Sequence, residues 1–561
     1  MRERFSTGTF TPDSMISCRT LIEANGYSQD DVARPLIGIA DSFTDLVPGH
    51  RNLRELTQQV KYGIYRAGGT PVEFGTIGVC DGVCCTHDGA RYSLPSRDLV
   101  ADSVEVMARA HRLDGLVLLA GCDKTVPGML MAAARLDIPC VFVAGGPMLS
   151  GPAFGPKAKS DSTSIEEAYG MYQTGSATRE ELSDLELNCC PTIGSCQHMA
   201  TANTMCCLAE GLGLSLPGSA AIPAVYNERR RSALSAGEAC VKLVRRGITA
   251  RDVVTPEALE NAVRLLLACG GSTNAVIHLA ALAHEIGLDP AWVLELIDEV
   301  GGETPLLVKI NPSSLEHDAE DFYHAGGMPR VMQALASQLH LGCLTVTGQT
   351  VESNLASYHY RYPADPSVIT TLDKPFSTLP GIVVLHGNLA PQTAVAKPAA
   401  IAPEVRRFSG PARCFDSEAA CAAAIGRREI KPGDVVVIRY EGPQGAPGMP
   451  EMFGPLKLLN GQGLAKQTAL ITDGRFSGTN NGCFVGHISP EAAAGGLIAL
   501  IEDGDIVTID VVRRTLTLEV DDETIARRRA AWSYTPPQVD GYLRRYAAQV
   551  SSANRGGVLG A

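Results

Sequence analysis

The chain has 561 residues, of which 45% are hydrophobic and 19% are charged, a composition typical of a soluble globular protein. Its length predicts more than one domain. The formal net charge of −13 at pH 7 argues against nucleic acid or an anionic membrane surface as a partner, because both repel an acidic protein.

The N-terminal segment MRERFSTGTFTPDS lacks the apolar centre of a signal peptide, and no apolar run approaches the roughly 18 residues of a membrane span. We therefore expect a cytoplasmic protein. The 17 cysteines among 561 residues are too few for a disulfide scaffold. In a reducing compartment most of them remain free thiols.

From residue 35 to residue 145, apolar runs alternate with helical patterns. This βαβα order predicts a parallel sheet covered by helices, in which ligands bind at the carboxyl ends of the strands. Apolar residues at helical spacing then predict mostly helix over residues 199–300. We predict strands at 35–41 and 138–148, strands that run into loops at 74–82 and 113–124, and helices at 52–68, 97–111 and 128–137.

Proline, serine and threonine become frequent around residues 350–385, which indicates a crossing between domains. Short β-like runs separated by turn signals follow. We predict an α/β N-terminal domain with a parallel sheet over residues 1–370. A β-rich, barrel-like C-terminal domain is predicted over residues 376–561.

Two predicted strands end in a cysteine followed by an aspartate. GVCDG contains Cys80 and Asp81, whereas GCDK contains Cys122, Asp123 and Lys124. Thiolate is a ligand for iron–sulfur clusters or zinc, and carboxylate suits Mg²⁺. Because neighbouring Cα atoms are about 3.8 Å apart, a cluster and a hard cation bound here would both reach one substrate.

A third group of cysteines lies in CCPTIGSCQHMATANTM, where Cys189, Cys190 and Cys196 precede a predicted helix. The amides of a helix N-terminus favour a thiolate or another anion. Two packed thiols and a helix cap explain the same spacing equally well. The sequence has no Cys-x₂-Cys pair, which disfavours a structural zinc ribbon.

Two glycine-rich segments of the C-terminal half carry further candidates. QTALITDGRFSGTNNG contains Arg475, which could hold a substrate carboxylate or form a structural ion pair. Its Ser477 does not lie in the G-x-S-x-G pattern of hydrolase nucleophiles. EGPQGAPGMPEM carries Glu441 and Glu451, either of which could reach a cation.

These motifs together resemble the dihydroxy-acid dehydratase and phosphogluconate dehydratase family. The resemblance runs from about residue 35 to about residue 500, and the tail GYLRRYAAQVSSANRGG resembles the dihydroxy-acid dehydratase ending. The matching stretches are EFGTIGVCDG, YSLPSRDLVADSVE, GCDKTVPGMLMAAARLDIP, GSCQHMATANTM, GGSTNAVIHLA, HGNLAP, YEGPQGAPGMPEM and TDGRFSG…GHISPEAA.

The resemblance implies a hydro-lyase that carries an iron–sulfur cluster and Mg²⁺. Such an enzyme converts a 2,3-dihydroxy acid into a 2-keto acid, as in branched-chain amino acid biosynthesis. It also implies site roles by position: Cys122 and Cys196 match cluster ligands, Asp81, Asp123 and Glu451 match magnesium ligands, Lys124 matches a lysine carbamylated in some relatives, and Ser477 matches the serine proposed as the base.

One position departs from the [2Fe–2S] members of the family, which carry a Pro-Cys motif after the first strand. Here the segment reads DLVPGHRNL, with Gly49 in place of cysteine. Phosphogluconate dehydratase-like members also lack that cysteine and have one at the position of Cys80. We therefore predict Cys80 as the third ligand of a [4Fe–4S] cluster, with [2Fe–2S] as the alternative. Cys84 and Cys85 stay open as candidates.

The sequence leaves the substrate open between a branched-chain dihydroxy acid and an aldonate, a sugar acid. Thr479 and Arg475 are the predicted substrate-binding residues, and a polar Thr479 could favour a polyol tail. A different class of function, an iron–sulfur redox or sensor protein, would use four cysteine ligands and no acidic magnesium site. We expect a homodimer or homotetramer.

Some polar residues near the motifs are expected to be structural. We predict His87, His198 and His278 as hydrogen-bonded packing residues. In GGSTNA, the segment 272–274 is predicted to cap a helix.

Overall fold

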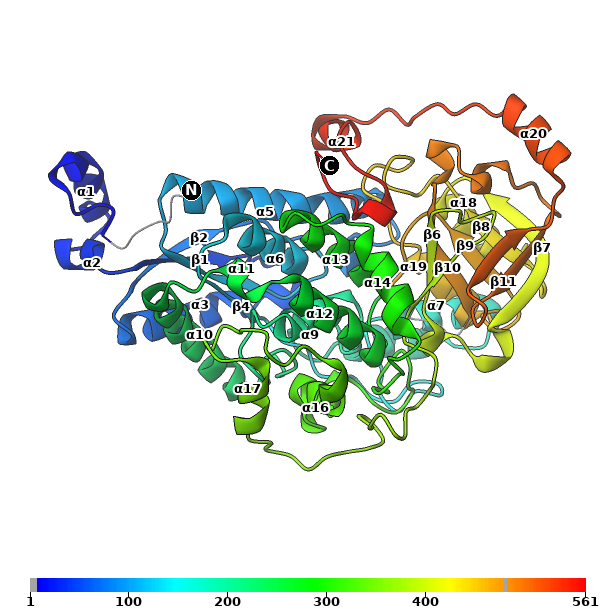
Figure 1. The fold of residues 1–561 in the computed structure, drawn as a ribbon. Coiled ribbons are helices and arrows are strands. Elements are labelled where there is room, and N and C mark those ends of the chain that lie inside the picture. Colours follow the sequence, from blue (N-terminus) through cyan, green and yellow to red (C-terminus); the bar gives the residue numbers. More distant parts are fainter. Residues whose placement is uncertain (1–7, 479–481, 561) are drawn as a thin grey trace.

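The computed structural model describes residues 8–478 and 482–560. Two parts lie side by side, each built on its own sheet (Figure 1). A short arm formed by α1 (Ile16–Glu23) and α2 (Gln29–Ala33) projects from the N-terminal part. Within the described ranges, no helix is long and apolar enough to cross a membrane.

The N-terminal sheet has four parallel strands in the order β2-β1-β3-β4. All residues of β1, β3 and β4 are buried, because helices α3 and α10 cover one face and α5 and α6 the other (Figure 1). The elements are β1 (Leu36–Asp41), α3 (Leu53–Arg66), β2 (Thr70–Gly75), α5 (Ser93–Ala110), β3 (Gly115–Ala120), α6 (Thr125–Leu136), β4 (Cys140–Ala144) and α10 (Asn227–Arg246).

The segment 74–82, predicted as a strand that runs into a loop, contains only the last two residues of the strand. The strand begins at Thr70 and ends at Gly75, where its pairing with β1 stops at Asp41. Beyond that point β1 offers no backbone groups to pair with, so the chain leaves the sheet. Cys80 therefore lies in a loop, and Asp81 begins the short helix α4 (Asp81–Cys84).

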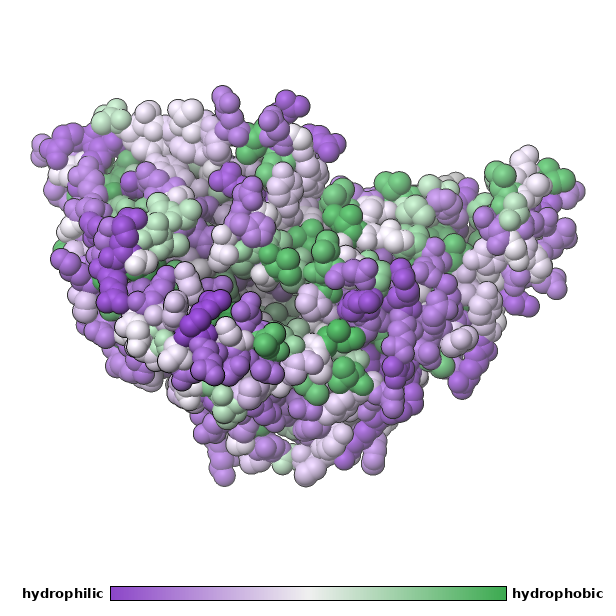
Figure 2. Space-filling view, turned by 180° about the vertical axis from the view of Figure 1, so that it is seen from behind, coloured by the Kyte–Doolittle hydropathy of each residue, from purple (hydrophilic) through white to green (hydrophobic). Residues whose placement is uncertain are grey.

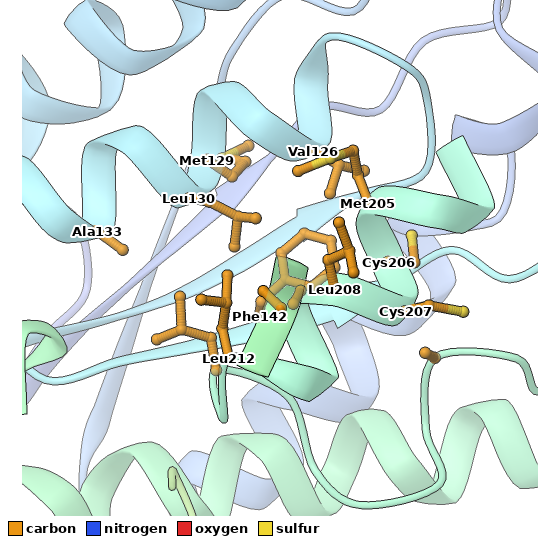
Figure 3. Packing of buried hydrophobic residues seen from close by; sticks show 14 of the residues in the cluster. Val126, Met129, Leu130, Ala133, Phe142, Met205, Cys206, Cys207, Leu208 and Leu212 are labelled. Carbon is orange, nitrogen blue, oxygen red and sulfur yellow. The ribbon is translucent and has the colours of Figure 1, made fainter. Parts of the chain in front are cut away.

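Further helices enclose the N-terminal sheet in one continuous hydrophobic core. Figure 3 shows α6 and α9 packing around Phe142 of β4, with Leu130, Met205 and Leu208 beside it. The helices of this core are α9 (Thr201–Gly211), α11 (Ala250–Val253), α12 (Pro256–Cys269), α13 (Asn274–Glu285), α14 (Trp292–Gly301), α15 (Ala319–His324), α16 (Gly327–Ala334) and α17 (Val351–Ser357). Helices α7 (Ser164–Thr174) and α8 (Arg179–Asn188) pack together in a separate small cluster.

After α17 the chain has no helix or strand until β5, and isolated bridges attach this segment to Leu306 and Val308. The C-terminal part follows as an eight-stranded mixed sheet in the order β12-β11-β7-β8-β9-β10-β6-β5. Its elements are β5 (Val383–Leu385), β6 (Thr393–Ala396), β7 (Arg407–Phe415), α18 (Glu418–Gly426), β8 (Val435–Ile438), α19 (Phe453–Gly461), β9 (Ala469–Thr472), β10 (Cys483–Ser489), β11 (Ile506–Asp510), β12 (Thr515–Leu518), α20 (Asp522–Ala531) and α21 (Gly541–Ala547).

The two edges of this sheet nearly close into a barrel. His386, next to β5, forms a bridge with Thr515 of β12, and the Leu516 amide donates to the His386 carbonyl at 2.8 Å. Closing a sheet satisfies its exposed edge groups. The observed architecture confirms the predicted α/β N-terminal part and barrel-like C-terminal part; the predicted limits at residues 370 and 376 stay predictions.

The C-terminal tail returns from the barrel to the N-terminal part (Figure 1). Arg97, fully buried on α5, donates hydrogen bonds to the Gly556 and Gly557 carbonyls at 3.0 and 2.8 Å. Tyr542 donates to the Pro95 carbonyl at 3.0 Å. The tail thus joins the two parts, beside the segments that carry the candidate site.

Candidate metal centre and active-site cavity

A cavity of about 400 Å³ opens between the two parts of the molecule. Its N-terminal wall contains segments that follow each of the four parallel strands, as expected for a ligand site at the carboxyl edge of such a sheet. Its C-terminal wall contains Glu451, Phe453 and Ser477. The face seen in Figure 2 is hollowed near its middle, with hydrophobic residues gathered around the hollow.

Three carboxylates meet at this cavity. Asp123 lies in the turn between β3 and α6, Asp81 begins α4, and Glu451 comes from the C-terminal part. One oxygen of each lies within 4.8 Å of the others. Asp81 Oδ1 is buried and accepts no hydrogen bond from any described residue. Carboxylate oxygens brought together in this way suit a hard cation such as Mg²⁺.

Lys124 places its ammonium group against the same carboxylates. Its side chain is fully buried, with Nζ 2.5 Å from Asp81 Oδ2 and 3.7 Å from Asp123 Oδ2. Burial alone would raise the pKa of Asp81, but the charges of Lys124 and Arg475 outweigh it and lower that pKa. Burial, together with the neighbouring carboxylates, raises the pKa of Asp123 to about 7. Burial thus makes the ionised form of Asp123 unfavourable in the folded chain, even beside Lys124.

Glu451 is held by side chains from both parts. Arg475 Nη1 lies 3.3 Å from Glu451 Oε2 and 3.5 Å from Asp81 Oδ2. Asn274 Nδ2 donates to the same Glu451 oxygen at 2.9 Å. One Glu451 oxygen is thereby directed into the triad by two fixed donors, which orients it as a ligand.

The three predicted cluster cysteines, Cys80, Cys122 and Cys196, line this cavity. The Cys122 thiol donates a hydrogen bond to Cys80, which lowers the pKa of Cys80 and raises that of Cys122. Burial raises the pKa of Cys196, and the charges of Asp123 and Cys80 raise it further. Thiols and carboxylates thus share one cavity, as the paired Cys-Asp motifs predicted.

Known proteins are similar to this chain over nearly its whole length. Residues 34–354 match the N-terminal domain, and residues 367–557 the C-terminal domain, of one family, dihydroxy-acid/6-phosphogluconate dehydratase. The chain belongs to this dehydratase family.

Several relatives carry the name dihydroxy-acid dehydratase, among them the three that follow. The protein of Caldanaerobacter subterraneus subsp. tengcongensis is 50% identical, over 96% of this chain and 96% of the relative. Those of Acetivibrio thermocellus and Moorella thermoacetica are each 49% identical, over 96% of this chain and 97% of the relative. The resemblance inferred from the motifs is confirmed.

The backbone at Gly49 has no room for a side chain in this member of the dehydratase family. A Cβ atom there would lie 2.5 Å from the Gly121 carbonyl oxygen and 3.3 Å from Ser195 Cα. Both contacts are with backbone next to the predicted cluster ligands Cys122 and Cys196. The loop of Gly49 is therefore packed closely against the segments that carry Cys122 and Cys196.

The two open cysteine candidates differ in position. Cys84 donates from its Sγ to the Cys80 carbonyl at 2.7 Å and is absent from the cavity wall, whereas Cys85 lines the cavity. Cys190 also lines it, and a hydrogen bond from Cys189 lowers the pKa of Cys190 to about 7. Cys80 therefore stays the predicted third ligand, with Cys85 as its nearest competitor.

Among the predicted residues of the C-terminal part, Ser477 lines the cavity and is 6% exposed. The Arg475 guanidinium donates to the Met449 carbonyl at 2.6 Å and contacts the Asp81 and Glu451 carboxylates. Its substrate-binding role stays a prediction. Thr479 lies outside the described residues. Glu441 accepts from the Glu418 amide at 2.7 Å and lies outside the triad.

Two residues expected to be structural lie at the site. In GGSTNA, the Asn274 backbone N–H donates to Ser272 Oγ at 3.2 Å, but Thr273, the N-cap residue of α13, makes no side-chain capping hydrogen bond. The Asn274 side chain instead holds Glu451. His198 lines the cavity, and burial lowers its pKa to about 4. The family motif around Asn274 marked this segment in the sequence. The motif did not show that Asn274 contacts Glu451 of the C-terminal part.

Proposed function

We propose that this chain is a hydro-lyase that dehydrates a 2,3-dihydroxy carboxylic acid to a 2-keto acid in branched-chain amino acid biosynthesis. One observation carries the proposal: in a member of this dehydratase family, the acidic triad, three cysteines and Ser477 line one cavity at a strand edge. We further propose that the enzyme works in the cytoplasm as a homodimer or homotetramer.

The donor set fits both implied groups. Asp81, Asp123 and Glu451 would hold Mg²⁺. Asp81 Oδ1 accepts no hydrogen bond from any described residue and is suited to such a ligand role. Carbamylation would replace the Lys124 ammonium by a carboxylate-like oxygen donor, which removes the ion pair with Asp81. Cys80, Cys122 and Cys196 would hold the cluster, for which we favour [4Fe–4S] over [2Fe–2S].

Both groups, when bound, would supply Lewis acidity for the carboxylate end and the C3 hydroxyl of the substrate. In our proposal Ser477 Oγ takes the C2 proton. The electron pair of the broken C2–H bond forms the C2=C3 double bond as the C3–O bond breaks. Ser477 then gives this proton to the leaving hydroxide, which becomes water and restores the deprotonated Oγ, and the enol rearranges to the 2-keto acid.

An aldonate is the alternative substrate, because the proposed chemistry requires only a carboxylate with hydroxyls at C2 and C3. A redox or sensor protein is the alternative of a different class. Three cysteines beside a hard-cation site favour the dehydratase, because electron transfer needs a fourth ligand and no magnesium.

The test is an anaerobic assay of the purified enzyme with 2,3-dihydroxyisovalerate and with a series of pentonates and hexonates. We expect the highest kcat/KM for the branched-chain acid, loss of activity with a Mg²⁺ chelator, and recovery on adding Mg²⁺. The freshly prepared protein should absorb visible light. A higher kcat/KM for an aldonate selects the alternative substrate, and a colourless anaerobic preparation contradicts the cluster.

A further inference from the structure

Lys397 is a buried lysine that the proposed reaction does not use. It follows β6 and precedes the 3₁₀ turn Pro398–Ala400, and it is 1% exposed. Its Nζ has no hydrogen-bond partner among the described residues. A buried amine without a partner is strongly unfavourable, so its presence calls for an anion or a developing negative charge nearby.

The side chain of Lys397 runs along the turn that carries Ser477. A Cβ atom at Gly478 would lie 2.4 Å from Lys397 Cδ and 3.3 Å from its Cβ and Cγ. Gly478 also has a φ of +79°, which favours glycine. The lysine stem and the residue after Ser477 are therefore in direct contact, and only a glycine permits this approach.

The electrostatics separate Lys397 from the other buried lysines of this region. Lys157 and Lys457 both pair with Glu167, at 3.2 and 2.7 Å. Burial lowers the pKa of Lys397 to about 7, with no carboxylate acting against it. Its charge also contributes to the lowered pKa of His198, which lines the same cavity as Ser477.

We propose that Lys397 is a positioning residue for the proton transfer at Ser477. Its stem fixes the Ser477–Gly478 turn, and its ammonium group stabilises the negative charge of the deprotonated Ser477 Oγ. This role rests on the proposed function, in which the C2–H bond breaks and the Oγ–H bond forms. The protonated form of Lys397 acts through Ser477 and transfers no proton to the substrate itself, in a site where burial strengthens charge interactions.

The experiment uses Lys397→Met, which keeps the stem against Gly478 and removes the charge. Wild-type and variant holoenzymes are assayed anaerobically with 2,3-dihydroxyisovalerate carrying hydrogen or deuterium at C2. We expect kcat to fall about 100-fold, KM to change less than about threefold, and iron and magnesium contents to stay the same. The deuterium isotope effect on kcat should rise, because proton removal becomes slower relative to the other steps.

Lys397→Gln is also uncharged and should reproduce the result. This second variant keeps the test valid if Lys397→Met does not fold. Lys466→Met is the control, because Lys466 pairs with Glu404 and both side chains are more than half exposed. A kcat near the wild-type value, or a fall accompanied by metal loss or an unchanged isotope effect, overturns the positioning role. If the wild-type enzyme is inactive on every acid offered, the proposed function itself is contradicted. The wild-type assay therefore separates this outcome from a failure of the positioning role alone.

Discussion

Single residues set the charge balance of the candidate site. Asp81, Asp123 and Glu451 bring three carboxylates together, and Lys124 and Arg475 contact them. Since burial raises the pKa of Asp123 to about 7, the folded chain holds this charge poorly without a further cation. A divalent cation would stabilise the ionised carboxylates of the triad, which is the electrostatic reason for proposing Mg²⁺ here.

Replacing Ser477 tests the proposed base. Ser477→Ala should lower kcat by about 10²–10⁴-fold, the usual contribution of a positioned general base, while iron and magnesium stay bound. Anaerobic turnover and metal analysis check this. Ser409→Ala, on a solvent-facing part of β7, is the control and should keep wild-type turnover; residual Ser477→Ala activity above roughly a tenth would exclude the base role.

Replacing Cys80 tests the third cluster ligand. Cys80→Ser should lower the iron content and the visible absorbance together, because serine is a poor ligand for a cluster that prefers thiolate. Cys18→Ser, at an exposed thiol on α1, should leave both unchanged. Full iron occupancy in Cys80→Ser, combined with loss in Cys85→Ser, would transfer the assignment to Cys85.

At the scale of elements, the loop after β1 packs against the turn after β3. Gly49 and Gly121 face each other so closely that a Cβ on either would approach the carbonyl oxygen of the other, at 2.5 and 2.2 Å. This contact holds the Cys122 turn close to the segment of Cys196. Element packing, and not the cysteines alone, thus shapes the proposed cluster site.

Gly49→Ala is therefore expected to destabilise the protein by about 1–3 kcal/mol, the usual range for overpacking, and to reduce cluster content. Gly49→Cys should behave likewise and should not restore the cysteine of the [2Fe–2S] relatives. Calorimetry and iron analysis measure both effects. Gly302→Ala is the control, because a Cβ there meets nothing within 4 Å; equal behaviour of Gly49→Ala and Gly302→Ala would contradict the packing argument.

At the scale of the whole molecule, the site depends on how the two parts are joined. Glu451 and Ser477 come from the barrel-like part, whereas the cysteines and the aspartates come from the N-terminal part. The C-terminal tail crosses back and supplies two carbonyl acceptors to buried Arg97. Arg97 Nη1 also lies 3.4 Å from Nδ1 of the buried His278.

A chain ending at Val550 lacks both acceptors of Arg97. Leaving buried donors unsatisfied costs about 1–3 kcal/mol each, so we expect a lower Tm and reduced activity. A chain ending at Gly560 keeps both carbonyls and is the control. An unchanged Tm and turnover in the shorter chain would show that the tail does not hold the two parts together.

The sequence by itself determined the alternation of strands and helices, the paired Cys-Asp turns and the candidate ligands. These are local features, since periodicity reports which face of a segment is buried and a motif reports the residue types that a ligand needs. It also predicted the two-part architecture, because β-like runs replace helical patterns along the chain. The start of β2 at Thr70 was missed, because it is set by pairing with Leu36 at the start of β1, and no local pattern shows that partner.

Only the tertiary structure decided which distant segments meet. Asn274 reaches Glu451 across 177 positions, Gly49 contacts Gly121, and Lys397 lies on the turn of Ser477 with no hydrogen-bond partner for its amine among the described residues. Such contacts depend on strand order, barrel closure and domain docking, which arise from packing of the whole chain. For this reason nothing in the sequence around Lys397 shows that its side chain is buried, whereas the folded chain buries it beside the Ser477 turn.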